Sequence, residues 1–382
     1  HCSIILLLIV KAQKEIVRMQ SPLLSPAEFA ADAILEEQTP VKEMIRLGIV
    51  GCGYVTALSH LPASLLTPQV AVTALADLDL SRAQEVAQHY HIPTATADYG
   101  ELWGQVDGVI VAVPHNHHAA VALDFLQQGI PVLVEKPMAM STAECQQMID
   151  VAAANQVALA VGQVRRFYDS SQLVKRLLET RFLGHVVRFE AQEAVLFDNF
   201  NASPFTLQPP AGGVLFDTGP HVLDALHWWL GDFAQVAYWD DAIAGVEANC
   251  RLEVTTTNGV PGVIELSRTR RLTNESRIWC EQGIITISAA NAYGVTIESA
   301  HFSGPISAAH VVDAAQARQI TPFFARQLHN FAAAIQGQAP LLTSGAEGMR
   351  AIATMQRCKA AKQPMATPKW AEIPEQVIAC LP

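Results

Sequence analysis

From Ile45 onward the chain alternates short β-branched runs with longer amphipathic segments. The expected strands are Arg46–Val50, Val70–Ala76, Gly108–Val113, Pro131–Glu135 and Ala158–Val161. Helical segments such as Ser81–His89 and His118–Gln128 separate them, and Gly129 suits the left-handed position that follows a helix. Strands separated by helices run parallel, because each helix carries the chain back across the sheet. The first half is therefore predicted to be an α/β domain with a doubly wound parallel sheet.

The pattern changes after about residue 167. A helix is expected at Ser171–Thr180, and strands joined by hairpins follow at Val186–Leu196, Val236–Trp239, Cys250–Thr257, Val260–Arg268, Ser276–Glu281 and Ile284–Ser288. Asn258-Gly259 and Gln282-Gly283 mark tight turns, because Asn and Gly accept the positive φ that such turns require. Two helices, Pro322–Gln336 and Ala346–Lys362, come last. We predict an α+β domain with an open, mainly antiparallel sheet.

Charge and cysteine spacing exclude several classes of protein. The chain has 25 basic and 36 acidic side chains, a net charge of −11, whereas nucleic-acid binders normally carry a basic surface. No nucleic-acid partner is therefore expected. The seven cysteines include no C-x-x-C pair, so neither a zinc ribbon nor a dense disulfide framework is expected. A reducing cytoplasm is the expected location.

A glycine-rich loop joins the first strand to the next helical segment, with the sequence Gly51-Cys-Gly53-Tyr54-Val55-Thr56. Gly51 allows a tight turn, and Gly53 lets the backbone approach a pyrophosphate that rests on helix N–H groups. Thr56 stands where the usual pattern has Gly or Ala, so the helix is expected to pack slightly more loosely on the strand. The loop alone is a weak indication of dinucleotide binding.

Asp77 strengthens this prediction, because it ends the second strand 24 residues after Gly53. A carboxylate at this place accepts hydrogen bonds from the adenosine ribose and repels a 2′-phosphate. NAD is therefore favoured as the cofactor, whereas Arg82, five residues later, keeps NADP possible.

The turn Glu135-Lys136-Pro137 lies at the carboxyl end of an apolar strand. Ligands of open α/β sheets bind beyond these strand ends. Most lysines are simply exposed, but Pro137 restricts Lys136 to extended geometry and so limits where its ammonium group points. Lys136 is predicted to point to the place where a nicotinamide and its substrate would meet.

Asp217 and His221 precede an apolar helix, Val222–Leu230, and lie four residues apart. If one helical turn includes both, they share a face, with Asp224 three residues further on. A carboxylate beside an imidazole orients the ring and equips it as a general base. An N-cap aspartate next to a surface histidine is an equally good interpretation of the helix alone.

In their order, these motifs resemble the Gfo/Idh/MocA family, the glucose–fructose oxidoreductase and inositol dehydrogenase group. The resemblance spans about residues 45 to 362. It rests on the glycine loop, Asp77, Val113-Pro114 with His118, Glu135-Lys136-Pro137, Gly212-Gly213, and Asp217 with His221. The Glu-Lys-Pro turn combined with the Asp-x-x-x-His helix is its most specific part.

The resemblance implies an NAD(P)-binding Rossmann domain and a second domain whose open sheet often forms an oligomer interface. It places Lys136, Asp217 and His221 at catalytic positions. The cofactor contacts expected from the loop and the resemblance together are Gly51, Gly53, Tyr54, Val55, Asp77, Arg82, Pro114, His118, Glu135 and Lys136. No metal site is expected at His115, His117 and His118, because tetrahedral zinc needs a further ligand and other spacing.

Four parts of the chain follow from this organisation. Residues 1–43 are predicted to be an N-terminal extension or a gene-boundary artefact, and their apolar stretch Ile4–Val10 is far shorter than the about 20 residues of a membrane span. Residues 44–165 are the dinucleotide-binding domain and residues 166–340 the substrate and oligomerisation domain. Residues 341–382 are a C-terminal helix and tail. No membrane partner is expected.

The expected activity is hydride transfer between nicotinamide and a secondary hydroxyl or ketone of a sugar, sugar derivative or cyclitol. His221 would take the hydroxyl proton while Asp217 holds its ring, and Lys136 would stabilise the developing alkoxide. The alternative is a non-catalytic or regulatory NAD(P)-binding protein of the same fold. A short-chain epimerase is disfavoured, because no Tyr-x-x-x-Lys pair occurs.

Two further expectations concern the outer face of the second sheet and the arginine pair Arg165-Arg166. A homo-oligomer is expected if the outer face of the second sheet is apolar, as the alternation in Arg251–Val254 and Val263–Leu266 indicates. Arg165 and Arg166 have two interpretations: contact with an acidic group of the substrate, or ion pairs with surface carboxylates.

Overall fold

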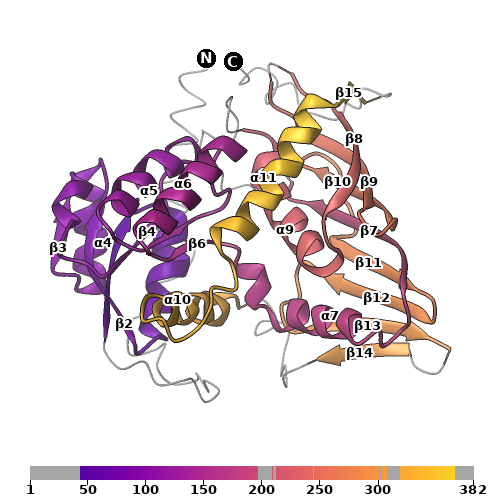
Figure 1. Cartoon of the computed structure of the whole chain (residues 1–382), viewed down its shortest axis with the longest axis horizontal. Coiled ribbons are helices and arrows are strands. Elements are labelled where there is room, and N and C mark those ends of the chain that lie inside the picture. Colours follow the sequence, from indigo (N-terminus) through magenta and orange to yellow (C-terminus); the bar gives the residue numbers. More distant parts are fainter. Residues whose placement is uncertain are drawn as a thin grey trace.

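The computed structural model describes residues 44–196, 209, 212–243, 245–300, 303–307 and 319–365. Two sheets form the two halves of this part of the chain (Figure 1). The predicted extension at residues 1–43 and the end of the tail after residue 365 lie outside the described residues.

The first sheet has six parallel strands in the order β3-β2-β1-β4-β5-β6. Their bounds are β1 Ile45–Val50, β2 Val70–Ala76, β3 Thr94–Thr96, β4 Gly108–Val111, β5 Val132–Val134 and β6 Leu159–Val161. The order reverses between β1 and β4, which is where doubly wound sheets bind their ligands. The predicted α/β class is confirmed, and only the three-residue β3 was not expected.

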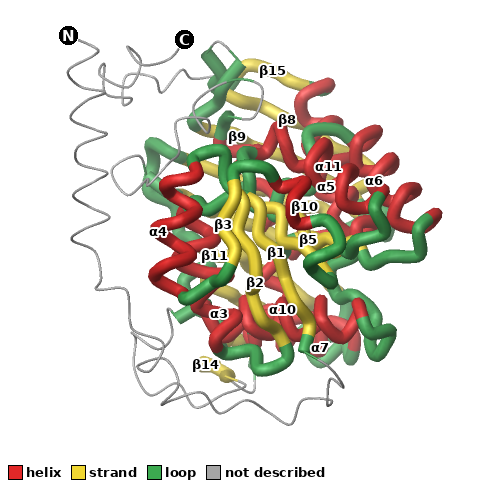
Figure 2. The backbone as a smooth tube through the Cα atoms, turned by 90° about the vertical axis from the view of Figure 1, so that its left-hand side faces the viewer, coloured by secondary structure: helices red, strands yellow, loops and turns green. Residues whose placement is uncertain are grey.

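Helices cover both faces of this sheet (Figure 2). The helices α5 (His118–Gln127) and α6 (Thr142–Ala154) pack on one face. The other face is covered by α3 (Leu61–Leu65), α4 (Leu80–Tyr90) and α10 (Thr321–Ile335). Although α10 lies in the range predicted for the second domain, its residues Phe323, Leu328 and Phe331 share a core with strand β1.

The second sheet has the order β14-β13-β12-β11-β7-β10-β9-β8-β15 and is mainly antiparallel. Its strands are β7 Val186–Ala194, β8 Phe233–Asp240, β9 Asn249–Thr256, β10 Pro261–Ser267, β11 Glu275–Cys280, β12 Gly283–Ser288, β13 Gly294–Ser299, β14 Ser303–Ser307 and β15 Lys362–Pro364. Two pairs are parallel, β7 with β10 and β8 with β15. The predicted open sheet is confirmed, whereas β13, β14 and β15 were not expected.

The two faces of the second sheet differ. Its inner face carries buried side chains such as Leu252 and Ile264, against which α7 (Asp169–Glu179) and α9 (Gly219–Leu230) pack. Its outer face at β9 and β10 carries Arg251, whose guanidinium pairs with Glu253 (2.9 Å) and Glu265 (3.1 Å). The apolar outer face that the oligomer prediction assumed is therefore not present at these strands, because the alternation turns the charged side chains outward.

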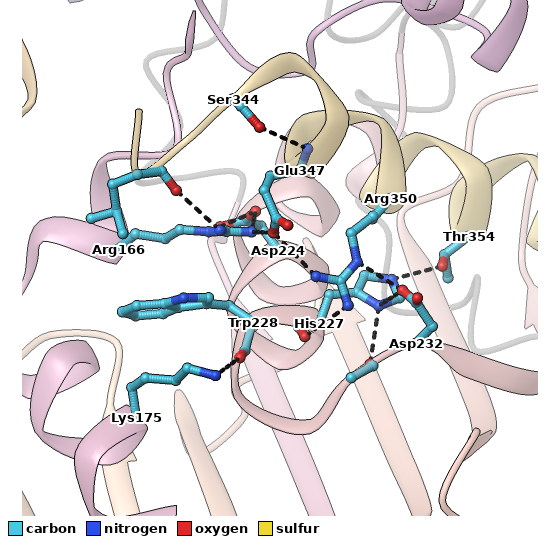
Figure 3. A network of polar contacts seen from close by, with 12 residues as sticks. Arg166, Lys175, Asp224, His227, Trp228, Asp232, Ser344, Glu347, Arg350 and Thr354 are labelled. Atoms are coloured by element: carbon cyan, nitrogen blue, oxygen red, sulfur yellow. Dashed lines mark hydrogen bonds and ion pairs between the residues drawn. The ribbon is translucent and has the colours of Figure 1, made fainter. Parts of the chain in front are cut away.

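Arg166 joins the two halves (Figure 3). It lies in the short helix η4 (Val164–Phe167), directly after the first sheet. Its guanidinium donates to Asp224 of α9 (2.7 Å), to Glu347 of α11 (Gly345–Ala360; 2.7 Å) and to the carbonyl of Leu342 (3.2 Å). The ion-pair interpretation holds for Arg166, but the pair with Asp224 is buried rather than at the surface.

The same network continues along α11 (Figure 3). Arg350 donates to Glu347 (3.1 Å) and to Asp232 (2.7 Å), and its Nη2 donates to the carbonyl of His227. The His227 Nε2 lies 2.9 Å from the Thr354 hydroxyl. Burial, and then the charge of Arg350, lower the pKa of His227 to about 4, so this ring is neutral at pH 7.

Candidate active site

The glycine loop folds as a tight turn against the end of β4. Gly51 has φ of +97°, and a Cβ there would lie 2.4 Å from the carbonyl oxygen of Ala112. Gly53 faces open space, because a Cβ there would meet no atom within 4 Å. The hydroxyl of Thr56, which is fully buried, donates to the carbonyl of Gly51 (2.5 Å). Thr56 thus ties the loop to the π-helical turn η1 (Thr56–His60) instead of loosening it.

Asp77 connects the end of β2 to this loop. Its Oδ2 accepts from the N–H of Cys52 (2.8 Å), and its Oδ1 accepts from the N–H of Asp79 (2.9 Å). Arg82 lies between two carboxylates, 3.5 Å from Asp77 and 3.3 Å from Asp79. A guanidinium held in this way is balanced by acidic side chains, so it is a poor partner for a 2′-phosphate.

This loop fits a dinucleotide. A pyrophosphate requires the tight turn at Gly51 and the open space at Gly53. The ribose requires an acceptor such as the carboxylate of Asp77. Tyr54 is exposed beside the loop, and Val55 precedes η1. The remaining predicted cofactor contact at a strand end, Pro114, is exposed after β4. These residues all lie at the carboxyl edge of the first sheet.

His118 does not face this edge with a free nitrogen. Its ring is buried, with Nδ1 2.7 Å from the carbonyl of Pro137 and Nε2 2.8 Å from the carbonyl of Val113. Because both ring nitrogens face backbone oxygens, the predicted contact of His118 with the dinucleotide would not be a hydrogen bond from its ring. His118 instead ties the turn after β4 to the turn that carries Lys136.

Glu135 is also held internally. Its Oε1 lies 2.8 Å from Nε2 of His60, and its Oε2 accepts from the N–H of Lys136 (3.1 Å). The carboxylate rests on Gly162, where a Cβ would lie 2.9 Å from it. Glu135 is 7% exposed, so it joins η1 to the Lys136 turn rather than offering its carboxylate to the cofactor. His60 was not predicted, and a single histidine 75 residues from its partner gives no sequence signal.

Lys136 reaches from the first half of the molecule into the second. The peptide bond between Lys136 and Pro137 is cis. The Lys136 Nζ donates to the carbonyl of Asp217 (3.0 Å) and lies 3.3 Å from its Oδ1. The structure thus brings together two of the three residues that were predicted to be catalytic.

Asp217 ends the short helix α8 (Val214–Asp217) and has two cationic partners. Arg268 donates to its Oδ2, and Lys136 lies at its Oδ1. Burial alone would raise the pKa of Asp217, but Lys136, Arg268 and His115 lower it to about 2. The carboxylate is therefore ionised throughout the physiological range.

The predicted contact in which the Asp217 carboxylate orients the His221 ring is not formed, because no hydrogen bond joins the two side chains. The helix breaks between them, because α8 ends at Asp217 and α9 begins at Gly219-Pro220, where proline has no N–H to continue the ladder. The Asp217 carboxylate instead turns to Lys136 and Arg268. Spacing by four residues therefore did not by itself make the two side chains partners.

His221 lies close enough to Lys136 for the ammonium charge to act on its ring. Its Nδ1 is buried and has no hydrogen-bond partner among the described residues. Burial, then the charges of Lys136 and Arg165, hold the pKa of His221 well below its usual value. The imidazole is neutral at pH 7 and can accept a proton.

The two cations that act on His221, Lys136 and Arg165, are connected by further charges of alternating sign. Arg165 makes a double hydrogen bond to Glu193 (2.6 and 2.7 Å). The ion-pair interpretation of Arg165 therefore holds, but Glu193 is buried and not at the surface. Burial lowers the pKa of Arg268, while the charges of Asp217 and Glu193 oppose that shift. The result is a row of charges of alternating sign, each interacting with the next, that runs from Lys136 through Asp217, Arg268 and Glu193 to Arg165. Arg268 and Glu193 were missed because charged residues in a strand predict a solvent face.

Glu247 sets the position of α8. Its Oε1 accepts from the N–H of Leu215 (3.0 Å), and its Oε2 pairs with Lys359 (2.6 Å). Gly213 has φ of +105°, and a Cβ there would lie 2.3 Å from the Glu247 carboxylate. The second glycine of the Gly212-Gly213 pair is thus needed so that this buried carboxylate can hold the helix that ends at Asp217.

Comparison with known families agrees with this geometry. Residues 45–163 match the oxidoreductase family with an NAD-binding Rossmann fold, and residues 171–286 match the GFO/IDH/MocA C-terminal domain. The chain belongs to the Gfo/Idh/MocA family. NAD is the favoured cofactor of this family member, in agreement with the acidic surroundings of Arg82.

Relatives span most of the chain. The rhizopine catabolism protein MocA of Rhizobium meliloti is 26% identical, covering 83% of this chain and 94% of that protein. Inositol 2-dehydrogenase of Rhizobium meliloti (strain 1021) is 24% identical, covering 81% of this chain and 94% of its own length. Trans-1,2-dihydrobenzene-1,2-diol dehydrogenase of Danio rerio is 37% identical, over 46% of this chain and 53% of that protein.

Solved structures share the fold. Levoglucosan dehydrogenase in complex with NADH and levoglucosan has a TM-score of 0.76 at 18% identity, over 84% of this chain and 97% of that one. An oxidoreductase from Agrobacterium radiobacter, in complex with NAD+, L-tartaric acid and magnesium, has a TM-score of 0.74 at 20% identity, over 83% and 96% of the two chains. Among the helices of the described residues, none combines the length and the apolar composition needed to cross a membrane.

Proposed function

We propose that this NAD-dependent dehydrogenase acts on a secondary hydroxyl group, or on the corresponding ketone, of a sugar, sugar derivative or cyclitol. The observation that carries the proposal is the meeting of Lys136 from the first half with Asp217 from the second, beside a neutral His221. The names of the relatives and of the structural neighbours, which include inositol 2-dehydrogenase and levoglucosan dehydrogenase, support the substrate class.

The residues divide the chemistry among them. A bound nicotinamide accepts or returns the hydride. Gly51, Gly53 and Asp77 would hold the dinucleotide, and His118 and Glu135 fix the turns on either side of Lys136. His221 takes the proton of the substrate hydroxyl, because its imidazole is neutral at pH 7.

Lys136 supplies the positive charge. Its ammonium would donate a hydrogen bond to the substrate oxygen and stabilise the negative charge that grows as the proton leaves. Asp217 holds this ammonium in place, since it accepts from Lys136 with both its main-chain and side-chain oxygens. In the direction of reduction, Lys136 polarises the carbonyl group, and His221 first takes up a proton from solvent and then gives it to the substrate oxygen.

A panel of substrates tests the proposal. Purified protein is incubated with NAD+ and cyclitols, aldoses and anhydrosugars, and the absorbance of the reduced nicotinamide is recorded; NADH with keto-sugars tests the reverse direction. Turnover of at least one compound by the wild type is expected. Binding of NADH without turnover of any compound would instead favour a regulatory dinucleotide-binding protein.

The cysteines and the outer face of the second sheet bear on the cellular location and on the oligomeric state. The five cysteines of the described residues are free thiols, which suits a reducing cytoplasm. A homo-oligomer through the outer face of the second sheet would cover charged side chains such as Arg251 and Glu265, which pair with each other within the chain, so its contacts would be polar and its association should weaken with salt. Size-exclusion chromatography that shows a monomer at micromolar concentration and low salt would contradict the oligomer.

A further inference from the structure

We propose that Arg268 is a positioning residue of this site, which holds the Asp217 carboxylate on the Lys136 ammonium group. The kinetic part of this proposal rests on the proposed function. Neither the glycine loop nor the Asp-x-x-x-His pattern pointed to Arg268, which follows strand β10 in the second half of the chain.

The guanidinium of Arg268 is fixed from several directions. Its Nη2 donates to the Oδ2 of Asp217, and its Nη1 donates to the carbonyl of Val195 (3.4 Å). The main-chain N–H of Arg268 donates to the carbonyl of Ala248 (2.8 Å). The residue is 4% exposed. A buried arginine held by its backbone and by a neighbouring carbonyl presents a cation at one defined place.

Asp217 therefore has one cation at each carboxylate oxygen. Arg268 occupies Oδ2, whereas Lys136 lies 3.3 Å from Oδ1 and 3.0 Å from the main-chain oxygen of Asp217. Rotation of the carboxylate would break both ion pairs, so the orientation of Asp217 is determined. That orientation in turn decides where the Lys136 ammonium lies.

Without Arg268, the carboxylate would have an alternative. The Nδ1 of His221 is buried and has no partner among the described residues, so a carboxylate that turned toward it would form the pair that the sequence pattern suggests. Lys136 would then lose its side-chain contact with Asp217. Arg268 thus selects between two arrangements of the same three catalytic residues.

A double-mutant cycle tests this role. The variants are Arg268→Met, Asp217→Asn and the two together, with Arg268→Lys as the conservative variant. We expect Arg268→Met to lower kcat by about 10- to 100-fold, the range of coupling between residues in contact. The dissociation constant of NADH, followed by its fluorescence, should change by less than about twofold, because a cluster on the substrate side leaves the dinucleotide loop intact.

The decisive readout is non-additivity. If Arg268 acts through Asp217, the double variant should have nearly the kcat of Asp217→Asn alone, and Arg268→Lys should recover part of the loss. Arg46→Met, which removes an exposed arginine paired with Asp107, is the control and should combine with Asp217→Asn additively. Additive losses for Arg268→Met and Asp217→Asn would overturn the proposal.

A crystal structure of Arg268→Met, or of Arg268→Gln if the first variant does not fold, decides the question without turnover. The Asp217 carboxylate is expected to leave Lys136. Unchanged contacts between Asp217 and Lys136 would overturn the positioning role, even if the wild type turned over no compound of the panel. The failure of the proposed function and the failure of this inference are thus distinguishable.

Discussion

Two clusters of charged side chains join the halves of this molecule, and they differ in how completely their charges are enclosed. The junction cluster is Arg166 with Asp224 and Glu347; the site cluster is Lys136 with Asp217 and Arg268. In the junction cluster, the central pair of Arg166 and Asp224 is enclosed, each side chain being 2% exposed, every nitrogen of the guanidinium donates, and only Glu347 reaches solvent (35%). In the site cluster, Arg268 is 4% exposed, but the central pair is open, with Lys136 16% and Asp217 23% exposed.

This difference in solvent exposure suits the two clusters to different roles. Charges that are removed from water and fully hydrogen-bonded fix the position of helices, but no donor remains for a ligand. Charges that are partly open to solvent keep a donor that can turn to a substrate oxygen. The junction cluster thus places α9 with its His221, and the site cluster carries out the chemistry beside it. Arginine–carboxylate pairs of similar composition serve two purposes in one molecule.

The largest effect is expected from breaking the junction cluster. Arg166→Met leaves the carboxylate of Asp224 buried without its main cation, so the free energy of unfolding should fall by about 3–5 kcal/mol. Urea unfolding followed by circular dichroism measures this change. Arg46→Met, at an exposed ion pair, should cost less than about 1 kcal/mol. Equal losses for the two variants would mean that enclosure does not distinguish the clusters.

Breaking the site cluster at Lys136 should affect turnover instead. Lys136→Met removes the donor to the substrate oxygen, and kcat should fall by about 100- to 1000-fold, the usual cost of losing such a donor. The affinity for NADH should stay within about threefold, since loss of a transition-state contact leaves ground-state binding unchanged. Lys362→Met, which removes an exposed lysine paired with Asp240 at the edge of the second sheet, serves as the control. Full turnover by Lys136→Met would show that this ammonium is not part of the reaction.

A pH titration sharpens the comparison, because the buried network contains His227. Its pKa is lowered from 6.5 to about 4 in the folded protein, so the unfolded chain binds the proton first as the pH falls. The stability is therefore highest above pH 6.5 and decreases toward pH 4, by up to about 3 kcal/mol from this group. His227→Gln should flatten that part of the curve of unfolding free energy against pH. An unchanged slope in the variant would assign the dependence to other groups.

The first sheet and the position of Lys136 at its carboxyl edge could be predicted because both follow from local rules, whereas the contact between Lys136 and Asp217 was not predicted. Apolar runs separated by helices give parallel strands, and the carboxyl ends of such strands face the ligand. The pairing of Asp217 with His221 could not be predicted correctly, since the break at Gly219-Pro220 and the attraction of Arg268 both act against the four-residue spacing.

Other features lie beyond local rules altogether. Glu193 lies on the same side of β7 as the buried Phe189 and Ala191, and Arg268 directly follows β10. A charged residue at such a place predicts exposure, and only the assembled fold supplies the partners with which both are buried. The placement of α10 on the first sheet is a contact between segments far apart in the chain. The charged outer face at Arg251 was visible in the alternation, but the alternation does not say which face the helices cover.

The position of α10 has a consequence for how the protein is made. One face of the first sheet, with Leu47, Ile49 and Leu75, is closed by Phe323, Leu328 and Phe331, which leave the ribosome long after the last strand of that sheet at Val161. At translation rates of about 5–20 residues per second, the growing chain waits on the order of ten seconds before α10 can join α3 and α4 on this face. The nucleotide-binding half thus cannot complete its core before the second sheet has been synthesised.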